Sequence, residues 1–415
     1  MPTAEVTCPA GTIVGTTDGT TSGDVRHFHS IRYSRFEGAF DDPRPAEQGL
    51  LIDASAERPG TPALSITAPA DAKLLTDLPV LVYIHGGRFE TGDHTETYSN
   101  PEGFAREGVI HVRVGYRLKF PGLLQFPTDQ PAHYRAVADV LEALAWVQRN
   151  IETFGGDPTN VTVMGQSAGA AIALWLSRRD HYRGEFRRAL AMSPVFPRRG
   201  FPTRKWAARG AIGKPLTRDS LNALFDSDRG KFDRAYKRFR TQYVTDMALG
   251  PHPLDTTELA EVPLVVTATD MEFYKSGKVY DSAGLGLTMA RTFGPRMDLR
   301  GDAARDYLAA LKERDRQHIA GQLIGDSLCR RFADMVAEGA PGPVWLAEHT
   351  DAFHSQDLTP LFRGALQPWL LEFVRSGEVG WPRYDENRTA IRRSRDGTAE
   401  IVTDPFGYLR DAFEY

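Results

Sequence analysis

The chain has 415 residues, of which 41% are hydrophobic and 25% are charged. These proportions are typical of globular proteins and exclude a disordered or collagen-like chain. The formal net charge of −4 at pH 7 gives no electrostatic reason to expect binding to nucleic acid or to an anionic membrane. With 2 cysteines and no histidine pair at a metal-binding spacing, the sequence predicts no metal site.

The cysteines and the N-terminal residues indicate a cytoplasmic protein. Cys8 and Cys329 are too few to form a disulfide framework, which favours reduced thiols. Their positions in the sequence leave open whether the two form one disulfide with each other. The N-terminal sequence MPTAEVTCPAGT has neither the basic nor the apolar segment of a signal peptide. No apolar run approaches the roughly 20 residues that cross a bilayer.

Short apolar runs rich in β-branched residues recur along the chain. They do not alternate with polar residues, which predicts strands buried on both faces, as in a parallel sheet. The predicted strands are 80–85, 109–114, 161–164, 189–192, 264–268 and 344–346. Apolar residues spaced three and four apart over 137–147 predict a helix with one apolar face. This alternation predicts an α/β fold, with a mostly parallel central sheet flanked by helices in a single domain over 1–415.

Two stretches interrupt the alternation of strands and helices. Residues 198–246 are rich in arginine, lysine and aspartate, and residues 300–340 have a helical composition. Both are expected to be helical excursions that cap the active site. The basic run RTAIRRSR at 388–395 is expected to be a solvated surface.

One pentapeptide carries the clearest chemical signal. The sequence GQSAG at 165–169 has the GxSxG form and lies between a predicted strand and a helix-forming run. This is the context of a nucleophile elbow, in which a sharp turn exposes a serine hydroxyl. The flanking glycines permit that turn, and the following helix directs N–H groups at a developing anion. We therefore predict Ser167 as a nucleophile; the alternative role is a plain helix N-cap.

A serine nucleophile needs a histidine base and an acid, which follow it in chains with this elbow, acid first. The acid is expected just beyond the fifth predicted strand, where Asp270 and Glu272 both lie. The histidine is expected beyond the last predicted strand, which His349 and His354 both follow. From the residues alone, either acid and either histidine fits.

The elbow also needs donors for an oxyanion. The sequence HGGRF at 85–89 follows the first predicted strand. Glycines there let the backbone approach a substrate closely, so that N–H groups bind the substrate oxygen. The alternative is a plain Gly-Gly turn at the end of a strand, which the presence of the elbow disfavours.

The segments around these residues contain further motifs. The most specific is FGGDP at 154–158, shortly before the elbow, and LPVLVYIHGG at 78–87, YR at 116–117 and AFHSQDL at 352–358 complete the set. Together they resemble the type-B carboxylesterase family, the cholinesterase-like branch of the α/β hydrolases. In its length the chain resembles a short bacterial member, similar to para-nitrobenzyl esterase. The resemblance is dense over 78–193 and thinner after it.

The resemblance implies an α/β-hydrolase fold and a serine carboxylesterase that hydrolyses small-molecule carboxylic esters through an acyl-enzyme, with no cofactor. It implies the triad Ser167, Glu272 and His354, because Glu272 falls at the family's acid position and His354 in its histidine segment. The implied oxyanion donors are the backbone N–H groups of Gly87, Arg88 and Ala168.

Two departures from the family's pattern lie beside the predicted nucleophile and oxyanion donors. Arg88 stands where the family usually has a third glycine; its side chain narrows the acyl pocket, recognises an anionic acyl group, or turns away into a local ion pair. Gln166 replaces the usual glutamate before the serine, which weakens the case for a cationic substrate. The residues expected to line the substrate pocket are Gly86, Arg88, Phe89 and Gln166.

Other functions use the same residues. A lactone or carbamate hydrolase or an acyltransferase would need the same triad. A catalytically silent, cholinesterase-like binding protein usually lacks triad residues. Because serine, acid and histidine are all available here, an active esterase is the expected function. The sequence indicates neither the natural ester nor the oligomeric state.

Overall fold

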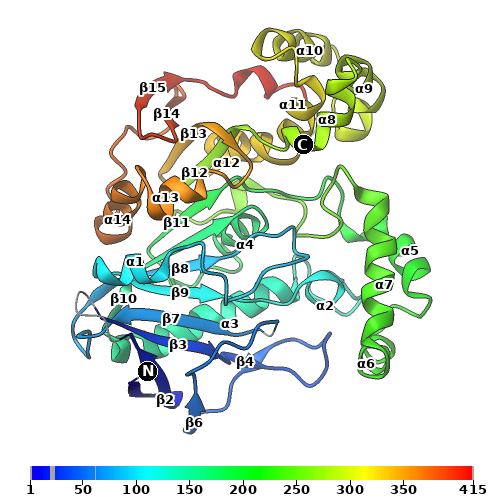
Figure 1. The fold of residues 1–415 in the computed structure, drawn as a ribbon. Coiled ribbons are helices and arrows are strands. Elements are labelled where there is room, and N and C mark those ends of the chain that lie inside the picture. The colour runs from blue at the N-terminus through cyan, green and yellow to red at the C-terminus, as the bar shows by residue number, and fades with distance from the viewer. Residues whose placement is uncertain (1, 19–23, 61, 414–415) are drawn as a thin grey trace.

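The computed structural model describes residues 2–18, 24–60 and 62–413. In this part of the chain, 13 strands form one sheet in the order β1-β2-β3-β7-β9-β8-β10-β11-β12-β13-β14-β15, with β6 paired to β2, while β4 and β5 form a separate pair (Figure 1). The strands are β1 (Thr3–Cys8), β2 (Gly11–Thr17), β3 (Val25–Ile31), β4 (Ser34–Arg35), β5 (Arg44–Pro45), β6 (Leu50–Asp53), β7 (Leu64–Pro69), β8 (Leu78–Ile84), β9 (Ile110–Val114), β10 (Gly156–Gln166), β11 (Arg188–Met192), β12 (Leu264–Met271), β13 (Val344–Phe353), β14 (Thr389–Ser394) and β15 (Ala399–Thr403).

Helices pack on both sides of this sheet. They are α1 (Pro101–Arg106), α2 (Lys119–Leu123), α3 (Arg135–Asn150), α4 (Ala168–Leu176), α5 (Phe201–Ile212), α6 (Arg218–Ser227), α7 (Arg229–Arg240), α8 (Tyr274–Ser282), α9 (Gly286–Phe293), α10 (Ala303–Arg314), α11 (Ile319–Gly325), α12 (Arg331–Gly339), α13 (Leu358–Arg363) and α14 (Gln367–Ser376). In α3 the predicted apolar stripe is buried against the sheet, as its spacing requires.

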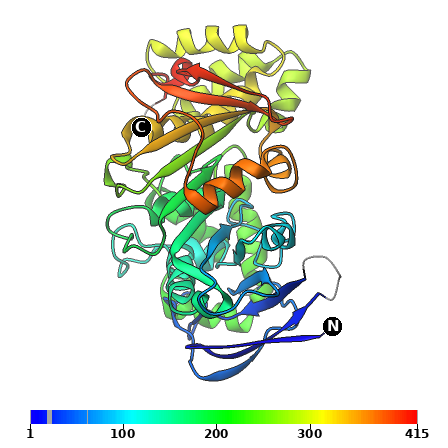
Figure 2. The same cartoon turned by 90° about the vertical axis from the view of Figure 1, so that its left-hand side faces the viewer.

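The centre of the sheet is parallel. Strands β9, β8, β10, β11, β12, β13 and β14 are neighbours that run in one direction. The outer strands β1, β2, β3 and β7 form antiparallel pairs at one end, and β15 forms another at the opposite end (Figure 2). This arrangement confirms the predicted α/β class, and each predicted strand lies within or beside one of the parallel strands. The antiparallel N-terminal strands were not predicted, although β1 alternates exposed and buried residues.

The parallel register brings several strand ends to one edge. Gly165 of β10 pairs with Ile84 of β8, and Gln166 pairs with Met192 of β11. Met192 in turn pairs with Thr267 of β12. The loops that follow β8, β10, β11 and β12 therefore leave the same edge, where ligands bind in open α/β sheets.

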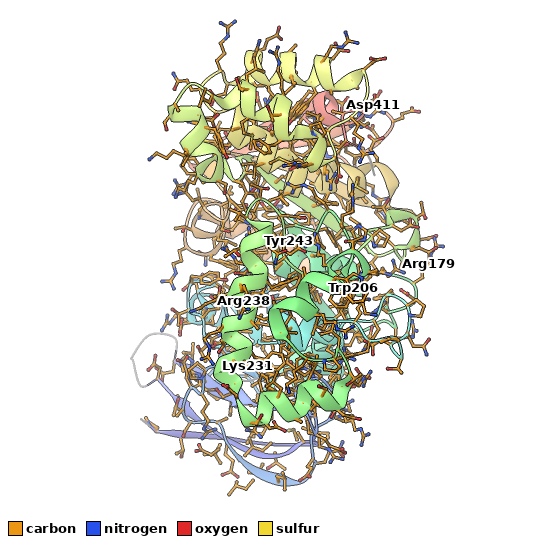
Figure 3. All side chains as sticks on the ribbon, turned by 90° about the vertical axis from the view of Figure 1, so that its right-hand side faces the viewer. Arg179, Trp206, Lys231, Arg238, Tyr243 and Asp411 are labelled. Atoms are coloured by element: carbon orange, nitrogen blue, oxygen red, sulfur yellow. The ribbon has the colours of Figure 1, made fainter. Side chains whose placement is uncertain are left out.

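Helices occupy both predicted excursions. Helices α5, α6 and α7 lie within 198–246, and α10, α11 and α12 lie within 300–340. Trp206 of α5 and the basic side chains Lys231 and Arg238 of α7 are seen on the face that these two helices form (Figure 3). That these excursions cap the site, and that 1–415 is one catalytic domain, stay predictions.

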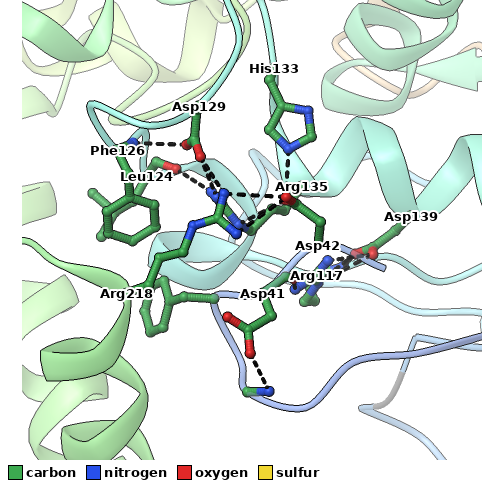
Figure 4. A network of polar contacts seen from close by, with 12 residues as sticks. Asp41, Asp42, Arg117, Leu124, Phe126, Asp129, His133, Arg135, Asp139 and Arg218 are labelled. Carbon is green, nitrogen blue, oxygen red and sulfur yellow. Dashed lines mark hydrogen bonds and ion pairs between the residues drawn. The ribbon is translucent and has the colours of Figure 1, made fainter. Parts of the chain in front are cut away.

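Helix α6 is attached to the body of the fold through a polar network. The guanidinium of Arg218 lies 2.6 Å from Oδ1 of Asp129 and 3.2 Å from Oδ2 of Asp42 (Figure 4). The buried Arg135 at the start of α3 reaches the same two carboxylates, at 2.8 Å and 3.4 Å. The side chains of Arg135 and Asp129 are buried, and both arginines contact the same two carboxylates, so the network links α6 to α3.

The prediction for 388–395 is wrong in its main part. Residues 389–394 form strand β14, in which Ala390 and Ile391 are buried. The guanidinium of Arg393 lies over the rings of Trp369 and Trp381. A guanidinium is attracted to the faces of aromatic rings, so a basic residue can be covered by them and a basic run can still form a strand of the sheet.

No helix in the described part of the chain is both long enough and apolar enough to cross a membrane.

Candidate active site

Ser167 occupies the turn between β10 and α4. Its backbone has φ 56° and ψ −116°, a strained conformation that turns the chain sharply. A Cβ on Gly169 would lie 2.1 Å from the carbonyl oxygen of Ile84, so only glycine lets α4 approach β8 this closely. Among the described residues, no backbone N–H of α4 donates to the Ser167 side chain. The structure therefore gives no support to the N-cap alternative.

The Ser167 hydroxyl contacts a histidine and, through it, a carboxylate. Ser167 Oγ and His354 Nε2 are 2.9 Å apart. The other ring nitrogen of His354, Nδ1, is hydrogen-bonded to Oε2 of Glu272. Glu272 follows β12 and is fully buried, whereas His354 follows β13 and is partly exposed. The structure thus brings together the three residues that the resemblance implied.

Asp270 and His349 take part in other interactions. The Asp270 carboxylate accepts hydrogen bonds from the backbone N–H groups of Asp351 and Ala352, at 3.0 and 3.2 Å. His349 is buried, and its Nδ1 lies 2.8 Å from Oδ2 of Asp357. The structure therefore does not bring these two alternatives to the serine.

The buried Glu272 carboxylate accepts hydrogen bonds from more than its triad partner. Besides His354, its Oε1 accepts from the hydroxyl of Ser193 and from the backbone N–H of Thr269, the latter at 2.8 Å. Burial alone would raise the pKa of this carboxyl, but the facing His354 ring and the three hydrogen bonds lower it to about 2. Ser193, the residue after β11, was missed by the sequence analysis because no motif marks it.

The lowered pKa of Glu272 predicts a loss of stability in acid. The ionised carboxylate stabilises the fold above its ordinary pKa of 4.5, and this contribution is lost as the pH falls from 4.5 toward about 2. The expected contribution is about 3 kcal/mol. Denaturant unfolding at a series of acidic pH values should show a steeper loss of unfolding free energy for the wild type than for Glu272→Gln. Parallel curves would contradict the assignment.

The turn after β8 lies against the elbow. A Cβ on Gly86 would lie 2.2 Å from Oε1 of Gln166 and 3.2 Å from Cβ of Ser167, so this glycine allows the close approach. The Gln166 side chain donates to the hydroxyl of Ser355 at 2.7 Å, and its Nε2 lies 3.4 Å from Nε2 of His354. Gln166 therefore connects the elbow to the loop that carries the histidine.

Three successive residues of this turn have left-handed backbones. Gly87 has φ 94°, and Arg88 and Phe89 both have φ 59°. The left-handed conformation costs a non-glycine residue roughly 1–2 kcal/mol. In the described part of the chain, no group accepts a hydrogen bond from the backbone N–H of Gly87, Arg88 or Ala168. The chain itself therefore does not use the three donors that the resemblance implied.

The side chains of Arg88 and Phe89, in this turn, both make contacts within the protein. Arg88 Nη2 donates to the carbonyl oxygen of Asp246 at 2.7 Å, and Arg88 Nε lies 3.8 Å from Oε1 of Glu90. The Phe89 ring is fully buried, with its edge toward Tyr116. Of the predicted pocket residues, Arg88 forms the local ion pair that was one of the three alternatives, and Phe89 belongs to the core.

One group in the described residues has the composition of a metal site. Ligand atoms of Glu272, Cys329 and His354 lie within 4.8 Å of one another. Both Glu272 oxygens already accept hydrogen bonds, and burial raises the pKa of the Cys329 thiol well above its ordinary value. A protonated thiol is a poor metal ligand, so the donor set fits a hydrogen-bonded triad better than a metal centre. Cys8 and Cys329 are both free and buried, hence not paired with each other.

Comparisons with known proteins show which proteins the chain resembles. A model of the carboxylesterase family matches residues 63–276. Over 115 residues, the chain is 41% identical to a juvenile hormone esterase of Heliothis virescens, which covers 28% of this chain and 20% of that protein. Over 200 residues, it is 34% identical to a probable N-octanoylanthranilate hydrolase of Rhodococcus erythropolis, covering 42% and 44%. The chain thus spans less than half of the length of these curated relatives.

The fold itself is shared over nearly the whole chain. A solved structure of PNB esterase superimposes with a TM-score of 0.76 at 24% identity, covering 98% of this chain and 99% of that one. The parallel sheet with its flanking helices is therefore an α/β-hydrolase fold. The family model matches more than half of the residues of this chain, so the chain belongs to the carboxylesterase family.

Proposed function

We propose that the protein is a serine carboxylesterase that hydrolyses small-molecule carboxylic esters through an acyl-enzyme. The observation that carries this proposal is the continuous hydrogen-bonded path from Ser167 through His354 to the ionised Glu272. A nucleophile, a base and an orienting carboxylate in this order define the serine-hydrolase mechanism. The family membership and the unused N–H groups beside the serine support the same reaction.

In the proposed reaction, Ser167 Oγ attacks the ester carbonyl carbon while His354 Nε2 accepts the hydroxyl proton. The negative charge that develops on the carbonyl oxygen is stabilised by the N–H groups of Gly87, Arg88 and Ala168; one such donor is worth roughly 3 kcal/mol. His354 then gives its proton to the leaving alcohol, which leaves the acyl group on the serine.

Deacylation repeats these steps with water as the nucleophile. His354 takes a proton from water, the hydroxide attacks the acyl carbon, and the carboxylic acid leaves as the proton returns to Ser167. Glu272 keeps the imidazole in the tautomer with a proton on Nδ1 and stabilises the imidazolium that forms. The hydrogen bonds from Ser193 and Thr269 hold the carboxylate in place for this role.

The site favours uncharged esters over cationic ones. Gln166 contributes an amide and no carboxylate next to Ser167, so no negative charge precedes the nucleophile to attract a cation. The guanidinium of Arg88 is engaged by Asp246 and Glu90, so it does not stand free to bind an anionic acyl group. The cytoplasmic setting stays a prediction, which the free thiols of Cys8 and Cys329 support.

Hydrolysis of p-nitrophenyl acetate, butyrate and octanoate by the wild type tests the proposed function. We expect turnover of at least one ester, and the rates along the series report the size of the acyl pocket. The same assay with a matched p-nitroanilide separates ester from amide hydrolysis. Absence of turnover for every ester would contradict the proposal. If a fluorophosphonate also failed to react with Ser167, a silent binding protein would be favoured.

A further inference from the structure

The turn after β8 holds a conformation that its own residues do not favour. Two non-glycine residues in succession, Arg88 and Phe89, have φ 59°. Such conformations persist only where surrounding contacts determine them. The backbone supplies part of the restraint, because the N–H groups of Glu90 and Thr91 donate to the carbonyl of Gly87, at 2.8 and 3.1 Å. The remaining contacts come from side chains and lead away from the sheet.

Charged side chains connect this turn to the first helical excursion. Arg88 reaches the backbone carbonyl of Asp246, which follows α7. The Glu90 carboxylate lies between two guanidinium groups, 3.8 Å from Arg88 and 3.1 Å from Arg240, the last residue of α7. The side chains of Arg88 and Glu90 are 24% and 16% exposed, so solvent screens the contact between them less than it screens a surface ion pair, whereas Arg240 is 39% exposed.

The far end of this connection is itself fixed. The Asp246 carboxylate pairs with Arg204 of α5 at 2.6 Å and accepts the backbone N–H of Arg198 at 3.1 Å. The buried Arg198 guanidinium donates to the hydroxyl of Ser327 at 2.6 Å. Arg218 joins α6 to the body of the fold through the network of Figure 4. These contacts hold Asp246 within the excursion, and Arg218 attaches the excursion to the body of the fold, so the turn is joined to a segment that is itself anchored.

We propose that Arg88 and Glu90 are positioning residues: they tie the turn to the excursion and thereby hold the N–H donors of Gly87 and Arg88 against Ser167. This inference rests on the proposed function and gives the excursion a role in holding the oxyanion donors, separate from its predicted role as a cap. The side chain of Arg88 acts on the reaction through its own backbone, without touching substrate. A shift of the donors by even 1 Å weakens the bonds to a developing oxyanion, so the rate depends on these contacts.

Replacing Arg88 separates this role from a merely structural one. Arg88→Ala and Arg88→Gly both remove the connection, but glycine also relieves the left-handed strain. We expect both variants to lower kcat by about 10- to 100-fold with KM changed by less than about 3-fold. The reduction should be equal for acetate, butyrate and octanoate esters, and Arg88→Gly should melt at a higher temperature than Arg88→Ala. The affinity for an aryl trifluoromethyl ketone should fall by the same factor as kcat/KM.

The second contact provides an independent test with a matched control. Arg240→Gln removes the partner of Glu90, whereas Arg238→Gln removes an exposed arginine on the outer side of the same helix (Figure 3). We expect a loss of kcat for Arg240→Gln and wild-type kinetics for Arg238→Gln. In the double variant Arg88→Gly with Arg240→Gln, the losses should be less than multiplicative, because both changes break one connection.

Four outcomes overturn the inference. Wild-type kcat in Arg88→Gly would show that the connection is not needed, and a loss confined to one ester length would assign Arg88 to the acyl pocket. A loss of kcat that tracks melting temperature across the variants would indicate a structural role only. If the wild type does not hydrolyse esters but reacts with a fluorophosphonate, the proposed function fails, while the relative labelling rates of the variants still test the positioning. Failure of both reactions in the wild type overturns both proposals.

Discussion

Ser167→Ala is expected to lower kcat/KM for p-nitrophenyl esters by at least about 10⁴-fold, because the alanine side chain has no atom that attacks the carbonyl. The residual rate would come from substrate binding and oxyanion donors acting on water. The strained backbone of Ser167 tolerates alanine no worse than serine, so the variant should unfold at nearly the wild-type temperature. Steady-state kinetics together with thermal unfolding check both points.

Ser282→Ala serves as the matched control for this loss. Ser282 is an exposed serine near the end of α8 whose hydroxyl only donates to the carbonyl of Lys278. Its replacement should leave kcat/KM at the wild-type value. If Ser167→Ala kept more than about one hundredth of the wild-type activity in a preparation free of wild-type enzyme, the nucleophile would be another residue.

Glu272→Gln is expected to lower kcat by about 10³- to 10⁴-fold with little change in KM. The glutamine amide would offer a donor to His354 Nδ1, which favours the tautomer with the proton on Nε2, and that tautomer does not accept the Ser167 proton. The imidazolium would also lose the ionised partner that stabilises it. Kinetics on p-nitrophenyl acetate would measure the change directly.

The competing acid supplies the control for the Glu272 variant. Asp270→Asn alters a carboxylate only two residues away that accepts from the backbone of β13, and it should reduce kcat by less than about 10-fold. Comparable losses in the two variants would mean that the carboxylates matter through the structure of the loop, with no specific role for Glu272.

The parallel core could be predicted from the sequence because its strands are apolar on both faces. Runs such as 161–164 and 264–268 have no other way to bury their side chains, so they became β10 and β12. The GxSxG motif likewise has few conformations open to it, and Ser167 lies where the motif requires. By contrast, the prediction of a solvated surface at 388–395 is wrong, because the rings of Trp369 and Trp381 that contact Arg393 lie outside the local sequence of β14.

Local sequence could not decide between the two acids or the two histidines. Which side chain reaches the serine depends on loop backbones, including the left-handed Phe273 and Ser355, with φ 53° and 70°. No glycine or turn motif at these two positions predicts a left-handed backbone. The direction of the Arg88 side chain is equally nonlocal, because Arg88 and Asp246 are 158 residues apart in the chain and meet only in the fold. The resemblance to a family, with its aligned motifs, carried the choice of Glu272 and His354.

The most direct test of the central claim is to trap the acyl-enzyme and locate it by mass spectrometry. Rapid mixing with p-nitrophenyl acetate, followed by an acid quench and digestion, should give a burst of p-nitrophenol and an acetyl group on the peptide that contains Ser167. His354→Gln should show neither the burst nor the acetyl group, because no base remains to activate the hydroxyl. A burst with the acetyl group on another residue, or turnover with no acetylated peptide at any time, would contradict the account.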